Sequence, residues 1–398
     1  GANVLEKGTS NGVFTDFDGK FSLNLTTSNP ELEVSYIGFS TKTVLVDNKE
    51  ILNIQLSDIK LLIGTHLHSD HVGLSTVLRN EGIKTDIDLA GKGPSKNLSY
   101  ANSFDIPYVL FIGSDLGSGV LDDMKLELPK QWFMEGVSEQ HIIGMAAGLA
   151  MEGFIPYVNT IATFLTRRCF EQVALDLCLH DLPVRLIANG GGVVYAPLGP
   201  THLATEDLAI LRTLPNMTVV VPCDAEEMKR LMAETLDYPH PIYIRLAKGG
   251  DKVVSLEENG FTIGKAILMK RPEKGLFVTT GIMTQLALQA CEILKEENLK
   301  CGVLHMHTIK PLDHEALQLW LPQVQGVVSV EEHTRIGGLG SALLEFCSDE
   351  MPDQLIKIRR IGLPDRFADQ YGSQNSLLNH WGINVENLAH TMRHVLKK

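Results

Sequence analysis

The sequence predicts an α/β protein in which two parallel-sheet domains follow a small all-β sandwich. Three observations lead to this prediction. The chain has 398 residues, more than one hydrophobic core ordinarily organises. From residue 114 onward, apolar strand-like runs alternate with helix-like segments, which is typical of parallel α/β domains. Residues 1–58 instead contain short stretches of alternating polarity bounded by turn residues, which is typical of antiparallel sheets.

Composition narrows the class of protein. The formal net charge is −13 at pH 7, which argues against a nucleic-acid-binding or anionic-membrane surface. No apolar run approaches the ~20 residues that span a bilayer, and no basic-then-apolar signal segment opens the sequence. The cysteines include no close C-x-x-C pair. We therefore expect no nucleic acid, no membrane span, neither structural zinc nor a disulfide framework, and a cytoplasmic location.

The sandwich is expected within residues 1–58. Dipeptides of Asn-Gly at 11–12 and Asp-Gly at 18–19 predict hairpin turns. The segments whose alternation predicts half-buried strands are 21–25, 32–36 and 54–56. The run from Gly1 to Leu23 resembles the carboxypeptidase-regulatory-like domain that precedes the plug of Bacteroidetes outer-membrane receptors, beginning at its second strand. This resemblance implies a truncated module without catalytic chemistry.

A histidine-rich motif follows an apolar run and reads His66-x-His68-x-Asp70-His71. Imidazole and carboxylate groups are zinc ligands, and this spacing resembles the start of the dinuclear metal site in the metallo-β-lactamase fold. The later ligands of that family do not follow, because the pattern ends by Ser75. We therefore expect an orphaned fragment whose four side chains form a weak candidate cluster for metal binding or hydrolysis.

Residues 76–113 change character again. They resemble part of the anticodon-binding domain of histidyl-tRNA synthetase, although their basic residues are too few and too dispersed for a nucleic-acid surface. We expect a helix at 95–104 and a strand at 108–112 that joins the sheet of the next domain. With three partial resemblances in residues 1–113, we interpret 59–113 as a mosaic linker.

The body of the chain is expected to form α/β domains at residues 114–253 and 254–398. In the first domain, the predicted elements are helices at 140–151 and 225–236 and strands at 184–187 and 218–221. In the second domain, they are strands at 276–280, 301–306 and 327–331 and helices at 283–297 and 341–347. Asp224 is the expected N-cap of the helix at 225–236. We expect the glycine-rich turn at 332–340 to serve structure rather than to bind phosphate.

Two motifs in the first α/β domain carry candidate chemistry. A run of small and apolar residues from Glu139 to Gly148 places a carboxylate at the head of a helix. Further along, a Gly-Pro-Thr-His motif places His202 in a turn, so the two residues form a candidate acid/base pair. Together these motifs resemble the pyrimidine-binding domain of the transketolase family, which uses thiamine diphosphate. The resemblance covers residues 114–398.

The resemblance implies roles for individual residues. Glu139 corresponds to the carboxyl group that hydrogen-bonds N1′ of the aminopyrimidine ring and activates the cofactor. Phe164 matches the aromatic residue that stacks on that ring, and Asp115 and Arg167 are further cofactor-binding candidates. His202 corresponds to a catalytic residue that contacts the hydroxyl and carbonyl region of the substrate.

Arg245 resembles an arginine that clamps the substrate phosphate. The alternative is an arginine whose charge is satisfied by a salt bridge. Structural alternatives also exist for the other candidates: Glu139 at a helix start is favoured by the helix dipole alone, Phe164 is an ordinary core residue, and His202 is a turn residue satisfied by the backbone.

Departures from the family pattern bear on substrate and partner. Leu198 stands where most transketolases and deoxyxylulose-phosphate synthases have an aspartate that holds a substrate hydroxyl, and residues 189–192 replace a segment that offers a phosphate-binding histidine. No stretch matches the family's Gly-Asp-Gly…Asn motif for Mg²⁺ and diphosphate. We therefore expect Mg²⁺ to be held mainly by a separate diphosphate-binding transketolase N-terminal subunit, in an oligomer.

The function that the resemblance implies is transfer of a two-carbon ketol unit between sugars by a half-site subunit. The alternative within catalysis is 1-deoxy-D-xylulose-5-phosphate synthesis, which would decarboxylate pyruvate. The alternative from another class is a catalytically silent mosaic protein.

Overall fold

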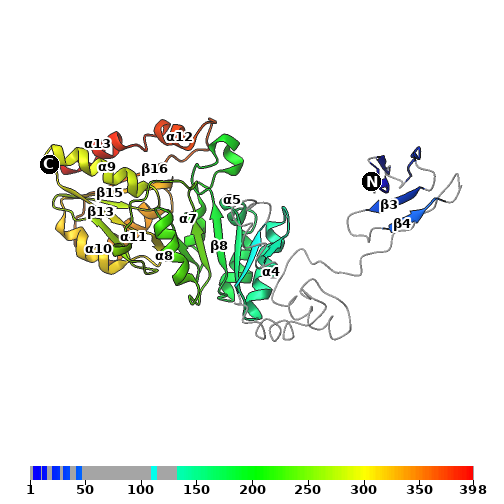
Figure 1. The fold of residues 1–398 in the computed structure, drawn as a ribbon. Helices are drawn as coiled ribbons and strands as arrows, with labels where there is room; N and C mark the ends of the chain where they lie inside the picture. Colours follow the sequence, from blue (N-terminus) through cyan, green and yellow to red (C-terminus); the bar gives the residue numbers. More distant parts are fainter. Residues whose placement is uncertain are drawn as a thin grey trace. The chain divides into compact units, whose positions relative to one another are not determined.

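The computed structural model describes residues 3–9, 11–15, 20–26, 30–35, 42–46, 109–113 and 132–397. The chain divides into two units, Gly1–Thr65 and His66–Lys398. Figure 1 shows the described helices and strands of both units. Among the helices described, none combines the length and the apolar character that a membrane span needs.

The first unit contains an antiparallel sheet in the order β2-β1-β3-β4. Its strands are β1 (Asn3–Glu6), β2 (Gly12–Phe14), β3 (Glu31–Ser35) and β4 (Lys42–Leu45). Val4 pairs with Val13 on one side and Val34 on the other, and a small apolar cluster buries Val4 and Val34. The predicted antiparallel architecture is therefore confirmed for the described residues.

The strand expected at 21–25 is wrong, because residues 20–26 form no ladder. Instead, the Thr26 backbone N–H donates to both carboxylate oxygens of buried Glu6 at 3.0 Å. The Glu6 carboxylate also accepts from Asn11 Nδ2 at 2.7 Å. The Glu6 side chain thus satisfies the Thr26 backbone N–H, which in a strand would pair with the backbone of a neighbouring strand. The segment expected at 54–56 lies outside the described residues.

The second unit begins with a seven-stranded sheet in the order β14-β9-β10-β8-β7-β5-β6. Its strands are β5 (Val109–Gly113), β6 (Trp132–Met134), β7 (Ile155–Ile161), β8 (Arg185–Asn189), β9 (Thr218–Val220), β10 (Ile242–Arg245) and β14 (Thr308–Lys310). Every pairing is parallel except that of β14 with β9. The predicted strand at 108–112 joins this sheet as β5, as expected.

A five-stranded sheet in the order β11-β13-β12-β15-β16 forms the second domain. Its strands are β11 (Ile267–Lys270), β12 (Gly275–Thr279), β13 (Cys301–His305), β15 (Gly326–Thr334) and β16 (Ile358–Leu363). Only β11 runs antiparallel to its neighbour. Because β14 follows β13 in the chain yet closes the other sheet, the two domains share a structural element as well as an interface.

Helices cover the sheets of the second unit (Figure 1). They are α4 (Glu139–Met151), α5 (Ala162–Thr166), α6 (Phe170–Gln172), α7 (Asp207–Arg212), α8 (Ala225–Thr235), α9 (Met283–Glu296), α10 (His314–Trp320), α11 (Leu339–Glu350), α12 (Gln374–His380) and α13 (Val385–Leu396). One buried apolar cluster extends from Ile142 in α4 to Phe346 in α11, so a continuous core joins both domains. The expected cap of α8 is confirmed, since Asp224 Oδ1 accepts from the Glu227 N–H at 2.9 Å.

Candidate active site

The carboxylate of Glu139 is buried at the first residue of α4. The residue is only 3% exposed. Its Oε2 accepts a hydrogen bond from Arg168 Nη1 at 2.9 Å. Its Oε1 is buried and has no hydrogen-bond partner among the described residues. A buried polar atom without a partner is costly and calls for an explanation, and here it leaves one carboxylate oxygen open to a ligand.

Phe164 contacts both Arg168, which binds this carboxylate, and His202. The Phe164 ring, in α5, meets the His202 ring edge-on with 5.3 Å between centroids. The Arg168 guanidinium, which binds Glu139, stands 3.9 Å from the Phe164 ring centroid. The structure therefore links three of the predicted site residues by successive contacts, from Glu139 through Arg168 to Phe164 and from Phe164 to His202. Sequence reasoning missed Arg168, whose only signal was its place next to Arg167.

The Arg167 guanidinium binds the backbone of the turn that carries His202. Its Nη2 donates to Leu203 O at 2.9 Å and to Glu206 Oε2 at 3.0 Å, and its Nε also bonds Glu206. Burial raises the pKa of Glu206, but its bonds with Arg167 and Thr205 outweigh burial and hold that pKa below its usual range. These contacts point to a positioning role for Arg167, and cofactor binding by its side chain stays a prediction.

The turn itself requires glycine at one position. Gly199 has a φ of +78°, and a Cβ there would lie 2.5 Å from Cε1 of Tyr371. Both the left-handed backbone and the close ring disfavour any larger residue. The following residues form a 3₁₀ turn (Pro200–His202), in which Thr201 Oγ1 and His202 Nδ1 are 2.9 Å apart. The local sequence thus fixes where the imidazole stands.

Arg245 is placed in the interior rather than at an open surface. It is 4% exposed, and its Nε donates to Asp207 Oδ2 at 2.8 Å. Its Nη2 donates to the backbone oxygens of Ala204 and Glu332 at 2.9 and 2.8 Å. A Cβ at Gly191 would lie 2.5 Å from the Arg245 side chain, so the backbone also encloses it. The guanidinium joins β10, α7 and β15, which supports the alternative of a salt-bridged arginine. A role of Arg245 in clamping the substrate phosphate stays a prediction.

The glycine-rich turn before α11 is organised by a protein carboxylate. Glu331 accepts from the N–H groups of Leu339 and Gly340 at 2.7 and 3.0 Å. These donors at the helix start are the groups that a phosphate would need. The contacts agree with the expectation that this turn serves structure. Burial raises the pKa of Glu331 to about 7, although both N–H groups act in the opposite direction.

This raised pKa predicts a pH dependence of stability. Because the ordinary value is 4.5, folded Glu331 keeps its proton at pH values where the unfolded chain has lost it. The resulting stabilisation is complete below pH 4.5 and is lost as the pH rises through about 7. Glu331→Gln should remove this component. The free energy of unfolding of the wild type minus that of the variant should then fall by up to about 1.4 kcal/mol per pH unit within the window. Urea titrations across that window check this, and parallel pH profiles would contradict it.

Two of the predicted sites cannot be placed. Asp115 and the cluster His66, His68, Asp70 and His71 lie outside the described residues. Within the described ranges, only one group of three potential metal ligands is close enough to share an ion, and it comprises Cys223, Glu227 and His305. Because this group contains a thiol, it does not fit Mg²⁺, which prefers oxygen ligands.

The fold defines the class of protein, one with two parallel-sheet α/β domains, and comparison with known families agrees with it. Residues 103–250 match the transketolase pyrimidine-binding domain, and residues 264–388 match the transketolase C-terminal domain. Residues 1–64 match the CarboxypepD_reg-like domain. The chain belongs to the transketolase family. Both of these resemblances are confirmed, whereas those to metallo-β-lactamases and histidyl-tRNA synthetase stay predictions.

Relatives of two kinds are similar to the chain. One of the subunits of the apulose-4-phosphate transketolase of Phocaeicola vulgatus is 34% identical over 283 residues, covering 71% of this chain and 89% of the relative. The 1-deoxy-D-xylulose-5-phosphate synthase of Rippkaea orientalis is 37% identical over 268 residues, which cover 66% of this chain and 42% of the synthase. The chain therefore spans less than half of that second relative. Transketolase subunits are transferases, so the family is one of enzymes.

Solved transketolase structures are similar to the chain as well. A split-gene transketolase, described as an inactive beta4 tetramer, superposes with a TM-score of 0.68 at 32% identity, over 76% of this chain and 96% of that one. A transketolase from Pichia stipitis superposes with a TM-score of 0.59 at 19% identity, covering 73% of this chain and 43% of that one, which shows the shared fold alone.

Proposed function

We propose that this chain is one subunit of a split transketolase that uses thiamine diphosphate to transfer a two-carbon ketol unit between sugars. The observation that carries the proposal is the buried Glu139 Oε1, which has no partner among the described residues. The relative from Phocaeicola vulgatus supports it, because that protein is named as a transketolase subunit and the alignment covers 89% of it.

The residues around Glu139 fit the pyrimidine end of the cofactor. When bound, thiamine diphosphate supplies the nucleophile and the electron sink for breaking and forming the carbon–carbon bond. Glu139 would hold the aminopyrimidine through Oε1, while Arg168 fixes the carboxylate through Oε2. A carboxyl group shielded from water is suited to share a proton with a ring nitrogen. Phe164 offers an aromatic surface next to this carboxylate.

The Arg168 guanidinium has to shift when the aminopyrimidine ring of the cofactor stacks on Phe164. Its guanidinium lies over that ring, but its side chain is 47% exposed, so it has room to move outward. An arginine and a pyrimidine both favour the face of an aromatic ring. We therefore infer that Arg168 orients Glu139 and covers Phe164 until the cofactor replaces it there.

His202 is proposed to act on the substrate. Its ring stands against Phe164, and the turn beneath it is held by Arg167. From this position, an imidazole N–H would donate to the sugar oxygen on which negative charge develops. The sugar remains open. Because Leu198 stands where a substrate-binding aspartate is usual, apulose 4-phosphate, which the name of the Phocaeicola vulgatus relative contains, is the first substrate to test.

The diphosphate and Mg²⁺ are proposed to be held by a separate N-terminal subunit, within an oligomer. No oxygen-ligand cluster suited to Mg²⁺ is present among the residues that the structure describes. The similarity to a split-gene transketolase supports a two-polypeptide arrangement.

A second candidate function is 1-deoxy-D-xylulose-5-phosphate synthesis. The observation in its favour is 37% identity to the synthase of Rippkaea orientalis. This reaction consumes pyruvate and releases carbon dioxide, whereas ketol transfer does not. Release of labelled carbon dioxide from pyruvate by the reconstituted enzyme would select the synthase, and ketol transfer without it would select the transketolase.

Calorimetric titration of thiamine diphosphate with Mg²⁺ tests the proposed half-site. We expect binding when the chain is mixed with a diphosphate-binding transketolase subunit, and none with either protein alone. Glu139→Ala should weaken the binding seen in the mixture. Equal binding by the chain alone would contradict the division of the site. No binding in any mixture, with both proteins folded, would favour a catalytically silent protein.

His202→Asn tests the substrate role. Loss of a donor to the developing oxyanion should lower the turnover of the reconstituted enzyme by roughly 10²- to 10³-fold. The dissociation constant for thiamine diphosphate should change little, because Glu139 and Phe164 remain. Steady-state kinetics and calorimetry measure both quantities. A loss of cofactor affinity equal to the loss of turnover would instead make His202 a cofactor-binding residue.

A further inference from the structure

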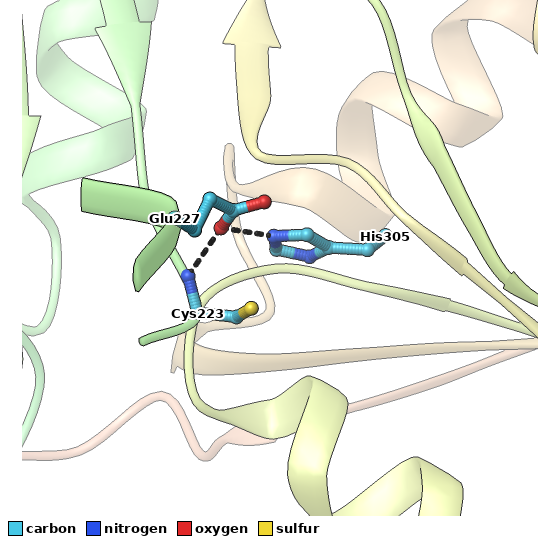
Figure 2. A group of neighbouring side chains, drawn as sticks. All are labelled: Cys223, Glu227 and His305. Atoms are coloured by element: carbon cyan, nitrogen blue, oxygen red, sulfur yellow. Dashed lines mark hydrogen bonds and ion pairs between the residues drawn. The ribbon is translucent and has the colours of Figure 1, made fainter. Parts of the chain in front are cut away.

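Three buried side chains with different ligand atoms converge where the two α/β domains meet. Cys223 precedes α8, Glu227 lies in the first turn of α8, and His305 ends β13 in the second domain. All three side chains are 0% exposed. Figure 2 shows them pointing toward one another from these separate elements. One atom from each lies within 4.8 Å of the other two.

The carboxylate of Glu227 is the centre of this cluster. Its Oε2 accepts from the Cys223 backbone N–H at 2.6 Å and lies 2.9 Å from His305 Nε2. Its Oε1 is buried without a hydrogen-bond partner among the described residues. A buried carboxylate with one open oxygen next to a thiol and an imidazole has more coordinating capacity than its protein neighbours use.

The imidazole is oriented as metal-binding histidines are. His305 Nδ1 lies 2.9 Å from Thr284 Oγ1, which in turn lies 2.9 Å from Thr279 Oγ1. With the proton on Nδ1 donated to Thr284, Nε2 becomes free to coordinate an ion. A hydrogen bond to the second ring nitrogen is the usual support of a histidine ligand.

A cavity lies next to the cluster. A cavity of about 240 Å³ is lined by Cys223 and Asp224 and by the exposed loop that contains Lys248, Gly249 and Gly250. Asp224 itself is occupied, because its carboxylate caps α8 and accepts from the N–H groups of Val254 and Ser255. The cavity borders the cluster at Cys223, whereas Glu227 and His305 do not line it. All three side chains are 0% exposed, so an ion reaches them through a local opening around Cys223.

We propose that Cys223, Glu227 and His305 bind a Zn²⁺ ion that links the two α/β domains. Thiolate, carboxylate and imidazole are established zinc ligands, and a thiolate with a carboxylate balances the charge of a divalent cation. On binding, the Cys223 thiol proton leaves to solvent and the His305 proton moves from Nε2 to Nδ1. The pattern is invisible to a search for C-x-x-C pairs, because the site takes one cysteine and a histidine from another domain.

The test uses the full chain, freed of metal and then titrated with Zn²⁺ or Co²⁺. We expect one ion per chain by elemental analysis and a thiolate-to-cobalt absorption band. Cys223→Ser should abolish that band. Cys291→Ser is the matched control, since Cys291 is equally buried but its Sγ faces the Gly302 carbonyl, and this variant should keep the band.

Thr284→Val provides a second variant that leaves all three ligands in place. Removing the hydroxyl that orients His305 should weaken Zn²⁺ binding by roughly 10- to 100-fold. Zn²⁺ should also raise the midpoint of thermal unfolding of the wild type, because an ion bound only to the folded state stabilises it. A stoichiometry below one ion, or a band that survives Cys223→Ser, would overturn the proposal.

Discussion

Replacing Glu139 by glutamine should lower the ketol-transfer rate of the reconstituted enzyme by roughly 10²- to 10⁴-fold. The amide keeps the shape of the side chain, and its oxygen still accepts the hydrogen bond from Arg168 that Oε2 receives at 2.9 Å. What is lost is the acidic group at the buried position of Oε1. Steady-state assays with saturating thiamine diphosphate measure the effect on turnover separately from the effect on cofactor affinity.

The same substitution should leave stability intact. Glu139 is 3% exposed and one of its oxygens lacks a partner among the described residues, so the wild type already carries the cost of a buried, incompletely bonded carboxylate. Glutamine at this position should therefore not lower the midpoint of thermal unfolding. The matched control is Glu135→Gln, which changes an exposed glutamate just before α4 and should alter neither rate nor stability. Full activity in Glu139→Gln would remove the carboxyl group from the mechanism.

Local signals account for the local structure that the sequence predicted correctly around the candidate site residues. Glu139 at the start of a helix and His202 in a glycine-containing turn each depend on a few neighbouring residues. The cap of α8 by Asp224 is likewise decided within four residues. Such features are visible in a sequence because short-range hydrogen bonding and backbone conformation determine them.

The features that the sequence did not predict depend on contacts between residues that are distant in the sequence. Arg167 and Arg168 are adjacent, and only the fold shows that Arg168 reaches Glu139, 29 residues away, while Arg167 reaches Glu206, 39 residues away. The burial of Arg245 depends on Asp207 and on the backbone of Glu332, which lies 87 residues further on. The pairing of strand β14 with β9 of the other domain is likewise a contact between residues distant in the sequence. No local pattern predicts such pairings.

The burial of Arg245 predicts a large loss of folding stability when this residue is replaced. Arg245→Ala should lower the free energy of unfolding by about 3–5 kcal/mol, because it leaves the buried carboxylate of Asp207 without its cationic partner. The Tyr243 hydroxyl, 2.7 Å from Asp207 Oδ2, would remain but carries no charge to compensate. Urea and thermal unfolding of the full chain measure the change.

A surface ion pair provides the matched control. Arg393 Nε donates to Glu297 Oε2 at 2.7 Å, and the two side chains are 31% and 42% exposed. Arg393→Ala should therefore cost no more than about 1 kcal/mol. The comparison separates two roles for Arg245. If it is the structural residue that its contacts indicate, Arg245→Ala loses stability. If it clamps a substrate phosphate, the variant should unfold like the wild type while the KM for a phosphorylated sugar rises.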